Sequence, residues 1–268
     1  MKQLFPIVPV LLSCALALVI MCGENVYNLG DDLTYREKFE IGKKYFEKGS
    51  YTRAKIVLDQ IARLGMLADF SDSAQFLLAE SHFNLRDYVF AENEYMRVLP
   101  GSPLWAKAIF MIGMCNYKLS SSPERDQKYT YKAINSFENF LIGTNPAQRD
   151  EQLSQDAINK LVELHGKLAE KDLKTGILYK KLGDYNGAII YLNDAMFNYN
   201  TYGHVSIIPR ALFEIGECYV KLEQYLEAEE KYNAVFQNFP DHPYAEKARK
   251  RLANIKNEIV KADTTFFK

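Results

Sequence analysis

The segment GECYVKLEQYLEA, residues 216–228, contains the pattern that decides the fold of this chain. A small residue is followed three positions later by an aromatic or polar residue, and then by a Tyr-x-x-Ala sequence. The pattern recurs as GKKYFEKGSYTRA at 42–54, AESHFNLRDYVFA at 79–91 and GILYKKLGDYNGA at 176–188. A fifth copy is interrupted by additional residues and contains Gly113, Asn116 and Ala133. Such recurrence indicates a repeat protein, for which binding is the leading function.

Each copy predicts two helices joined by a short turn. Small residues let the two helices approach closely, and the tyrosine fills the space beside them. Proline suits the first helical position, so Ser102-Pro103 and His242-Pro243 predict the starts of further helices. No copy can bury its apolar face alone, so the stack of copies is expected to be the stable unit.

Residues 35–250 resemble tetratricopeptide (TPR) repeats, on the basis of these five copies. The resemblance implies an all-α fold in which five helix pairs stack into a right-handed superhelix with a concave face. A last helix, at about 244–261, is expected to cap the stack. This capping helix is rich in basic residues, namely Lys247, Arg249, Lys250, Arg251, Lys256 and Lys261.

The composition argues against several classes of function. The net charge is -1 and 25% of residues are charged, so nothing favours a nucleic-acid partner. The four histidines are scattered, and none lies in an HExxH sequence. No phosphate-binding Gly-x-x-x-x-Gly-Lys loop and no Gly-x-Ser-x-Gly nucleophile turn occurs. We therefore predict a protein that is not an enzyme and that uses no cofactor and no metal.

Residues 1–22 have the form of a secretory signal, because Lys2 precedes an apolar run at 4–21. Cys22, at the end of this run, resembles a bacterial lipoprotein attachment site, although Met21 stands where a small residue is usual. Cys14 is the alternative, but cleavage there would leave an apolar tail on the mature protein. A third reading is an uncleaved membrane anchor, for which the run is barely long enough. All three readings place the repeats outside the cytoplasm.

The rest of the chain divides into a tether and two groups of repeats. Residues 23–33 read as the tether, and 34–146 hold repeats 1–3 with an inserted loop at 120–129. Residues 147–262 hold a long helix, repeats 4 and 5 and the capping helix. The long helix is predicted at 153–181 from the spacing of its apolar residues, with a length of about 43 Å.

The inserted loop sharpens the resemblance. Its sequence SPERDQKYT, residues 122–130, resembles the loop in the third repeat of the BamD-like family, the TPR lipoproteins of the outer-membrane β-barrel assembly machinery. In that family Arg-Asp-Gln commonly precedes Thr directly, whereas Lys128 and Tyr129 intervene here before Thr130. The repeat count, the long helix and the Cys-bearing leader agree with the same family. The resemblance implies a lipid-anchored protein on the periplasmic face of the outer membrane.

Aromatic residues seven positions apart on the first helix of each pair are expected to share one face. In the first three repeats they are Phe39 and Phe46, Phe76 and Phe83, and Phe110 and Tyr117. Such a stripe could bind an extended peptide with large apolar side chains. The family resemblance implies that its ligand is the C-terminal signal of unfolded outer-membrane proteins. Packing of these rings between repeats is the alternative.

Two sets of polar residues are candidate partner contacts. The loop set is Arg125, Asp126 and Gln127, and its alternative is a loop that satisfies itself. The C-terminal set is Glu214, Glu217 and Lys221, together with the capping helix, and its alternative is a solvated charged face. The resemblance implies that the C-terminal repeats hold the barrel-forming subunit and that other assembly lipoproteins also bind.

The predicted function is therefore a non-catalytic scaffold of outer-membrane protein assembly. One alternative is a periplasmic TPR scaffold in envelope division or peptidoglycan coordination. Another is a regulatory partner of a cell-wall enzyme.

Overall fold

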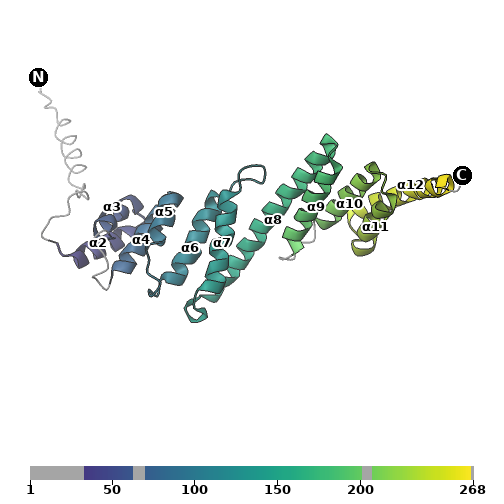
Figure 1. Cartoon of the computed structure of the whole chain (residues 1–268). Helices are drawn as coiled ribbons and strands as arrows, with labels where there is room; N and C mark the ends of the chain where they lie inside the picture. The colour runs from purple at the N-terminus through teal and green to yellow at the C-terminus, as the bar shows by residue number, and fades with distance from the viewer. Residues whose placement is uncertain (1–32, 63–69, 201–206, 267–268) are drawn as a thin grey trace, which may run out of the picture. The chain divides into compact units, whose positions relative to one another are not determined.

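The computed structural model describes residues 33–62, 70–200 and 207–266, and every regular element in these ranges is helical (Figure 1). The leader, with Cys14 and Cys22, and most of the tether lie outside the described residues. None of the described helices is both long enough and apolar enough to span a membrane.

The helices follow one another in pairs, which confirms the predicted all-α repeat fold. The pairs are α2 (Tyr35–Glu47) with α3 (Tyr51–Ala62), α4 (Ser71–Asn84) with α5 (Tyr88–Tyr95), α6 (Trp105–Leu119) with α7 (Lys128–Gly143), α8 (Glu151–Leu182) with α9 (Tyr185–Asn200), and α10 (Ile208–Lys221) with α11 (Tyr225–Asn238). A short 3-10 helix, η1 (Pro146–Gln148), precedes α8, and α12 (Pro243–Phe266) follows the last pair. The tyrosine of the repeat pattern is the first residue of α3, α5, α9 and α11.

The chain forms two compact units, residues 1–108 and 109–268, with the boundary inside α6. In unit 1, α3 packs between α2 and α4, and α4 packs against α5. In unit 2, α8 packs against α7 and α9, and consecutive helices stay in contact from α9 to α12. The right-handed superhelix and the grouping of repeats into 34–146 and 147–262 remain predictions.

The two helices of a pair meet at the small residue of the pattern. A Cβ atom on Gly42 would lie 2.8 Å from Cδ2 of Leu58, and one on Gly216 would lie 2.7 Å from the ring of Tyr232. Both contacts join residues sixteen positions apart, and Gly176 meets Leu192 at the same interval. Any side chain at these glycines would therefore push the second helix away from the first.

The interrupted third copy keeps this contact over a longer interval. A Cβ atom on Gly113 would lie 2.7 Å from the fully buried ring of Phe137. The extra residues form the loop 120–127, which is two residues shorter than predicted because α7 already begins at Lys128. The insertion is thus accommodated between the helices without changing how they pack.

The long helix is confirmed as α8, which has 32 residues and is about 48 Å long. Asp150 caps its start by accepting a hydrogen bond from the backbone N–H of Leu153 at 3.1 Å. Gly183 ends it in the left-handed conformation, with φ 86°, that glycine adopts at low cost.

Of the two predicted proline starts, one is confirmed and one is wrong. Helix α12 begins at Pro243, as predicted. Helix α6 begins at Trp105, two residues after Pro103. The hydroxyl oxygen of Ser102 accepts from the N–H of Leu104 at 3.2 Å, so the Ser-Pro sequence forms a turn before the helix.

A buried glutamine holds the loop 120–127 together. Gln127 is 2% exposed, and its amide nitrogen donates to the carbonyl oxygens of Ser122 and Arg125, both at 2.8 Å. Its amide oxygen accepts from the hydroxyl of Thr130 at 2.7 Å. All three side-chain bonds of Gln127 are thus made within the loop and the first turn of α7.

Helix α8 holds the same loop from the other side. The ammonium of Lys167 donates to the hydroxyl of Ser120 at 2.7 Å, and Lys174 forms an ion pair with Glu124. The hydrogen bond from Lys174 lowers the pKa of the Glu124 carboxyl to about 2. The loop is therefore bonded to α8 at its first residue and near its middle.

Substitution of Gly216 by alanine should destabilise unit 2. Overpacking costs about 1–3 kcal/mol, which outweighs the roughly 1 kcal/mol that alanine gains over glycine inside a helix. Gly143→Ala is the matched control, because nothing lies within 4 Å of its added Cβ. Urea unfolding followed by circular dichroism should show a lower midpoint for Gly216→Ala only. Equal midpoints would show that the helices can separate at no cost.

Gln127→Glu should weaken the internal hydrogen bonding of the loop, while keeping a side chain of the same size. The new carboxylate would face the carbonyl oxygens of Ser122 and Arg125 and lose two donated hydrogen bonds, each worth about 1–3 kcal/mol when buried groups are left unpaired. Limited trypsin digestion should cut after Arg125 faster in this variant than in the parent protein. Gln155→Glu, an exposed change on α8, should leave the cleavage rate unaltered. A Gln127→Glu rate equal to that of the parent would contradict the anchoring role.

Candidate functional site

The first member of each predicted aromatic pair is a core residue. Phe39, Phe76 and Phe110 are 8%, 5% and 6% exposed. Phe39 stacks on Phe70 with ring centroids 5.2 Å apart, and Phe76 meets Tyr95 edge-on at 5.4 Å. Phe110 packs against the rings of Phe137 and Phe140. Phe39 thus packs where the first repeat meets the start of α4, whereas Phe76 and Phe110 pack within their own helix pairs.

The second member of each pair is half-buried and keeps part of its ring at the surface. Phe46 and Phe83 each pack edge-on against the first tyrosine of the next helix, Tyr51 and Tyr88, at 5.4 and 5.3 Å. The hydroxyl of Tyr117 donates to Glu163 of α8. Phe110 and Tyr117 belong to unit 2 and the other four aromatics to unit 1, so a stripe across all six remains a prediction.

Unit 1 contains a hollow of about 340 Å³ beside α2 and α4, which we call the α2–α4 hollow. Its lining consists of Phe39, Lys43, Ser73, Phe76, Leu77 and Leu104. The two phenylalanines are thus core residues that also form part of the wall. The volume lies at the lower end of the range of about 300–1,000 Å³ that small ligand sites occupy.

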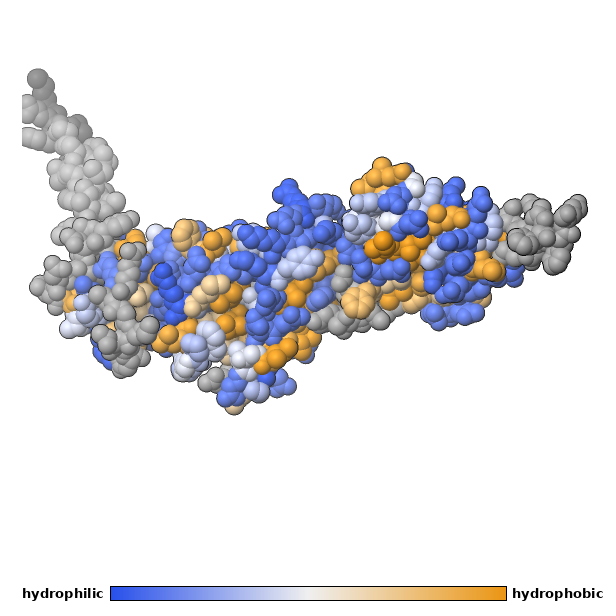
Figure 2. All heavy atoms as spheres, in the orientation of Figure 1, coloured by the Kyte–Doolittle hydropathy of each residue, from blue (hydrophilic) through white to orange (hydrophobic). Residues whose placement is uncertain are grey.

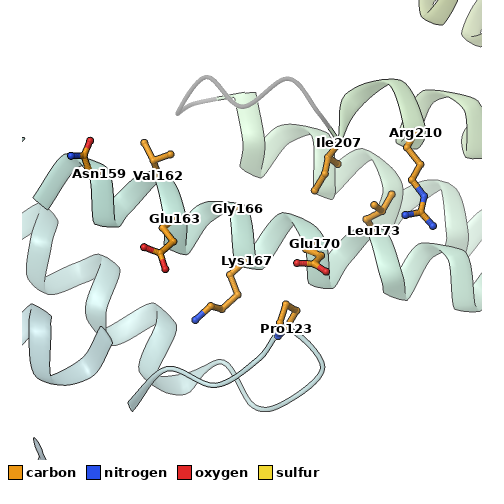
Figure 3. Close-up of a pocket in the computed structure, with 10 residues that line it drawn as sticks. All are labelled: Pro123, Asn159, Val162, Glu163, Gly166, Lys167, Glu170, Leu173, Ile207 and Arg210. Atoms are coloured by element: carbon orange, nitrogen blue, oxygen red, sulfur yellow. The ribbon is translucent and has the colours of Figure 1, made fainter. Parts of the chain in front are cut away.

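Unit 2 contains a larger groove of about 790 Å³ along α8, which we call the α8 groove (Figure 3). Its lining consists of Pro123, Asn159, Val162, Glu163, Gly166, Lys167, Glu170, Leu173, Ile207 and Arg210. Figure 3 shows Lys167 pointing from α8 toward the loop that carries Pro123, with Ile207 and Arg210 near Leu173. The loop of the family resemblance is therefore one wall of this groove.

The charges of the α8 groove are partly satisfied within the protein. Burial lowers the pKa of the Lys167 ammonium, which is bound to Ser120. Burial acts to raise the pKa of Glu163, but hydrogen bonds from Tyr117 and Lys160 outweigh it and lower that pKa. This groove was not predicted from the sequence, although Glu163, Lys167 and Glu170 are spaced so that they share one face of a helix.

The loop set of predicted partner residues separates into two kinds. Arg125 and Asp126 are exposed, and the carboxylate of Asp126 accepts from the backbone N–H of Lys128 at 3.1 Å. Gln127 is buried and makes its bonds inside the loop. The structure therefore leaves Arg125 and Asp126 accessible to a partner and gives Gln127 a structural role.

The C-terminal set of predicted partner residues also contains two kinds, residues bonded within the protein and an exposed one. Glu214 forms an ion pair with Lys180 of α8. Glu217 accepts hydrogen bonds from Tyr232 of α11 at 2.6 Å and from Arg251 of α12 at 2.7 Å. The two glutamates thus join neighbouring helices of unit 2, whereas Lys221 is exposed.

Helix α12 carries a further set of exposed basic residues. Lys247, Arg249, Lys250 and Lys256 are exposed, and Glu246 pairs with Arg249 and Lys250 at 3.7 and 3.6 Å. Among the described residues, His, Cys, Asp and Glu side chains nowhere gather in a group of three or more that could hold a metal ion.

Hydrophobic residues also reach the surface between the hydrophilic ones (Figure 2). The most exposed large hydrophobic residues in the described part of the chain are Ile142, Phe197, Leu182 and Leu226, which are 84%, 78%, 73% and 70% exposed. They lie on four different helices or their ends, and they provide control positions for substitutions elsewhere.

The sequence of the chain matches two models of known protein families. Residues 31–223 match the family model described as YfiO: Outer membrane lipoprotein. Residues 210–242 match a tetratricopeptide repeat model. A search of curated proteins finds no match.

Solved structures of TPR proteins are similar at low identity. A thermophilic TPR protein in Thermus thermophilus is 16% identical, with a TM-score of 0.34 and coverage of 82% of this chain and 98% of that one. The TPR protein YrrB, described as having an unusual peptide-binding site, is 16% identical, with a TM-score of 0.36 and coverage of 81% and 92%. The TPR2AB domain of yeast Sti1, in its pHSP90 complex, is 15% identical, with a TM-score of 0.39 and coverage of 85% and 86%.

The YfiO match spans well over half of the chain and includes both helices of the first four pairs, the loop 120–127 and the long helix α8. It confirms the resemblance that the loop and the repeats indicated. The chain belongs to the YfiO family of outer membrane lipoproteins, the BamD family, and carries TPR repeats.

Proposed function

We propose that this protein is a non-catalytic, lipid-anchored scaffold on the periplasmic face of the outer membrane, where it serves the assembly of β-barrel proteins. The observation that carries the proposal is the family match over residues 31–223. In this role the N-terminal repeats receive signals of unfolded outer-membrane proteins, and the C-terminal repeats bind the barrel-forming subunit. Other assembly lipoproteins bind the same scaffold.

The α2–α4 hollow supports the peptide-receiving role. Its wall combines Phe39 and Phe76 with Leu77 and Leu104, which suits a large apolar side chain. Phe46 and Phe83 lie seven positions beyond Phe39 and Phe76, on the same faces of α2 and α4. A peptide that fills the hollow could continue along these two half-buried rings.

The exposed polar residues of unit 2 support the subunit-binding role. Arg125 and Asp126 project from a loop that is held rigid by Gln127 and by α8. Rigid presentation lowers the entropy lost when a partner binds. Lys221 and the exposed basic residues of α12 offer a second contact for an acidic surface.

The sequence is also compatible with two other roles, in envelope division or in regulation of a cell-wall enzyme. The family match and the Arg-Asp-Gln loop favour barrel assembly over both. Affinity purification from native membranes with mass spectrometry separates them. Recovery of a large β-barrel protein with repeated periplasmic domains supports the assembly role, and its absence favours the others.

Phe46→Ala and Phe83→Ala should each weaken binding of a peptide that ends in an aromatic residue. Loss of an anchoring ring commonly costs about 1–2 kcal/mol, a roughly 5–30-fold change in affinity. Thermal unfolding should change little, because both rings are only half-buried. Phe197→Ala, on the exposed face of α9, is the matched control for ring removal. Unchanged affinity together with a large loss of stability would refute the peptide-binding role of these rings.

The double substitution of Arg125 and Asp126 by alanine should reduce co-purification of the barrel-forming subunit. Both side chains are exposed, so the fold should be kept. The melting temperature should fall slightly, because the N–H of Lys128 at the start of α7 loses the Asp126 carboxylate as its acceptor. The double substitution of Glu47 and Lys48 by alanine removes another adjacent, exposed pair of opposite charge and is the control. Equal recovery of the subunit with all three proteins would show that the loop does not contact it.

A further inference from the structure

The α8 groove has the length of a short extended peptide. Its lining runs along α8 from Asn159 to Leu173, which corresponds to about 21 Å at 1.5 Å per residue. An extended polypeptide advances about 3.3 Å per residue, so about six residues would cover this length. Val162, Leu173 and Ile207 form the apolar wall of the groove. The dimensions therefore favour an extended segment over a compact small molecule.

The two acidic side chains of the groove are already neutralised by groups outside it. Glu163 accepts a hydrogen bond from Tyr117 and pairs with Lys160 at 3.0 Å. Glu170 pairs with Lys174 at 2.7 Å. None of these three partners is among the residues that line the groove. The lining therefore has little acidic charge left to attract a basic ligand.

Lys167 is the first of two cations in the groove. It donates to the neutral hydroxyl of Ser120 at 2.7 Å, and it forms no ion pair with a described residue. Glu163 stands one turn earlier on α8 and its charge acts on Lys167, but burial has the larger effect and lowers the pKa of the ammonium. A carboxylate from a ligand would therefore find this ammonium without an ionic partner.

Arg210 is the second cation. It is exposed, and it extends from α10 toward α8 beside Leu173 (Figure 3). Glu214 stands one turn later on α10, but it is paired with Lys180. Among the described residues, no carboxylate forms an ion pair with Arg210. The groove thus combines an apolar wall with two cations that lack a carboxylate partner.

We propose that the α8 groove binds an extended acidic segment of a partner polypeptide, with carboxylates at Lys167 and Arg210 and apolar side chains against the apolar wall. The length of the groove and the complementary charge carry this assignment. A basic segment would find both carboxylates of the lining already paired. This site goes beyond the proposed function, which places the partner contacts of unit 2 at the tip of the loop and on the exposed basic residues.

A chain of hydrogen bonds connects the site to the loop 120–127. Lys167 donates to Ser120, and Thr130 donates to the amide oxygen of Gln127 at 2.7 Å. Each hydroxyl carries one hydrogen, so Ser120 must be the donor in its contact of 2.6 Å with Thr130. An ammonium has three N–H donors, so Lys167 can bind a carboxylate and keep its bond to Ser120. A bound segment should therefore hold Lys167 in place and stiffen the loop.

Binding of fluorescent peptides to the full chain, measured by anisotropy, tests the site. One peptide of about seven residues carries two glutamates among leucines and is blocked at both ends. A second has glutamine in both places, and a third has lysine. The glutamate peptide should bind about fivefold more tightly for each carboxylate than the glutamine peptide, and the lysine peptide should bind most weakly. Added salt should narrow these differences.

The variants separate charge from support of the loop. Lys167→Gln and Arg210→Gln should each lower the affinity for the glutamate peptide about fivefold and leave binding of the glutamine peptide unchanged. Ser120→Ala removes the bond to the loop but keeps the ammonium of Lys167, so the peptide should bind it as it binds the parent protein. Lys181→Gln removes an exposed charge of α8 outside the groove and is the control.

A second measurement tests the link to the loop. At saturation, the glutamate peptide should slow tryptic cleavage after Arg125 in the parent protein and in Arg210→Gln. It should give no protection in Lys167→Gln or Ser120→Ala, because the chain of hydrogen bonds is broken in both. An Arg125 cleavage rate that the bound peptide leaves unchanged in the parent protein would overturn this link.

The outcomes also keep this inference apart from the proposed function. Equal binding of the three peptides, or binding of none, overturns the acidic-segment site. An affinity that survives both Lys167→Gln and Arg210→Gln overturns it as well, and so does a loss in Ser120→Ala as large as that in Lys167→Gln. None of these results bears on the proposed function, which is tested by recovery of the barrel-forming subunit and by the substitutions of Phe46 and Phe83.

Discussion

The structure depends on one constraint, the close approach of two helices at a residue that is nearly without a side chain. Gly42, Gly176 and Gly216 each receive a large side chain from the second helix, sixteen positions further along the chain. Because the receiving space has no room for a Cβ atom, the register between the two helices is determined by this contact. The same register directs the aromatic and charged residues of the first helix to defined faces.

Because this contact recurs in each repeat, the repeats have equivalent positions, and different residue types can occupy the same position. Glu80 and Glu217 occupy one such position and accept hydrogen bonds from Tyr95 and Tyr232, which strengthens the second and fifth pairs. Arg251 of α12 joins the bond at Glu217 and extends the network into the next helix. Lys43 occupies the equivalent position in the first pair, where Leu58 replaces the tyrosine. Lys43 instead lines the α2–α4 hollow.

The irregular third repeat shows how an insertion can acquire a surface role without disturbing the core. Gly113 and Phe137 keep the same contact although the loop 120–127 lies between their helices. The loop is not loose, because Gln127 bonds it internally and Lys167 and Lys174 bond it to α8. Arg125 and Asp126 are consequently presented on a rigid support, beside the α8 groove.

The sequence by itself determined the helix pairs, the long helix α8 and the family, because each depends on local features. Small residues, tyrosines and turn residues recur at fixed intervals, and the segment 122–130 is distinctive. The sequence did not determine which aromatic rings are buried, that Gln127 is internal, or that Glu217 is bound to Tyr232 and Arg251. These outcomes were decided by the tertiary structure, because each depends on a neighbour from another helix. Exposure and charge pairing result from such packing between helices, which periodicity along one helix does not specify.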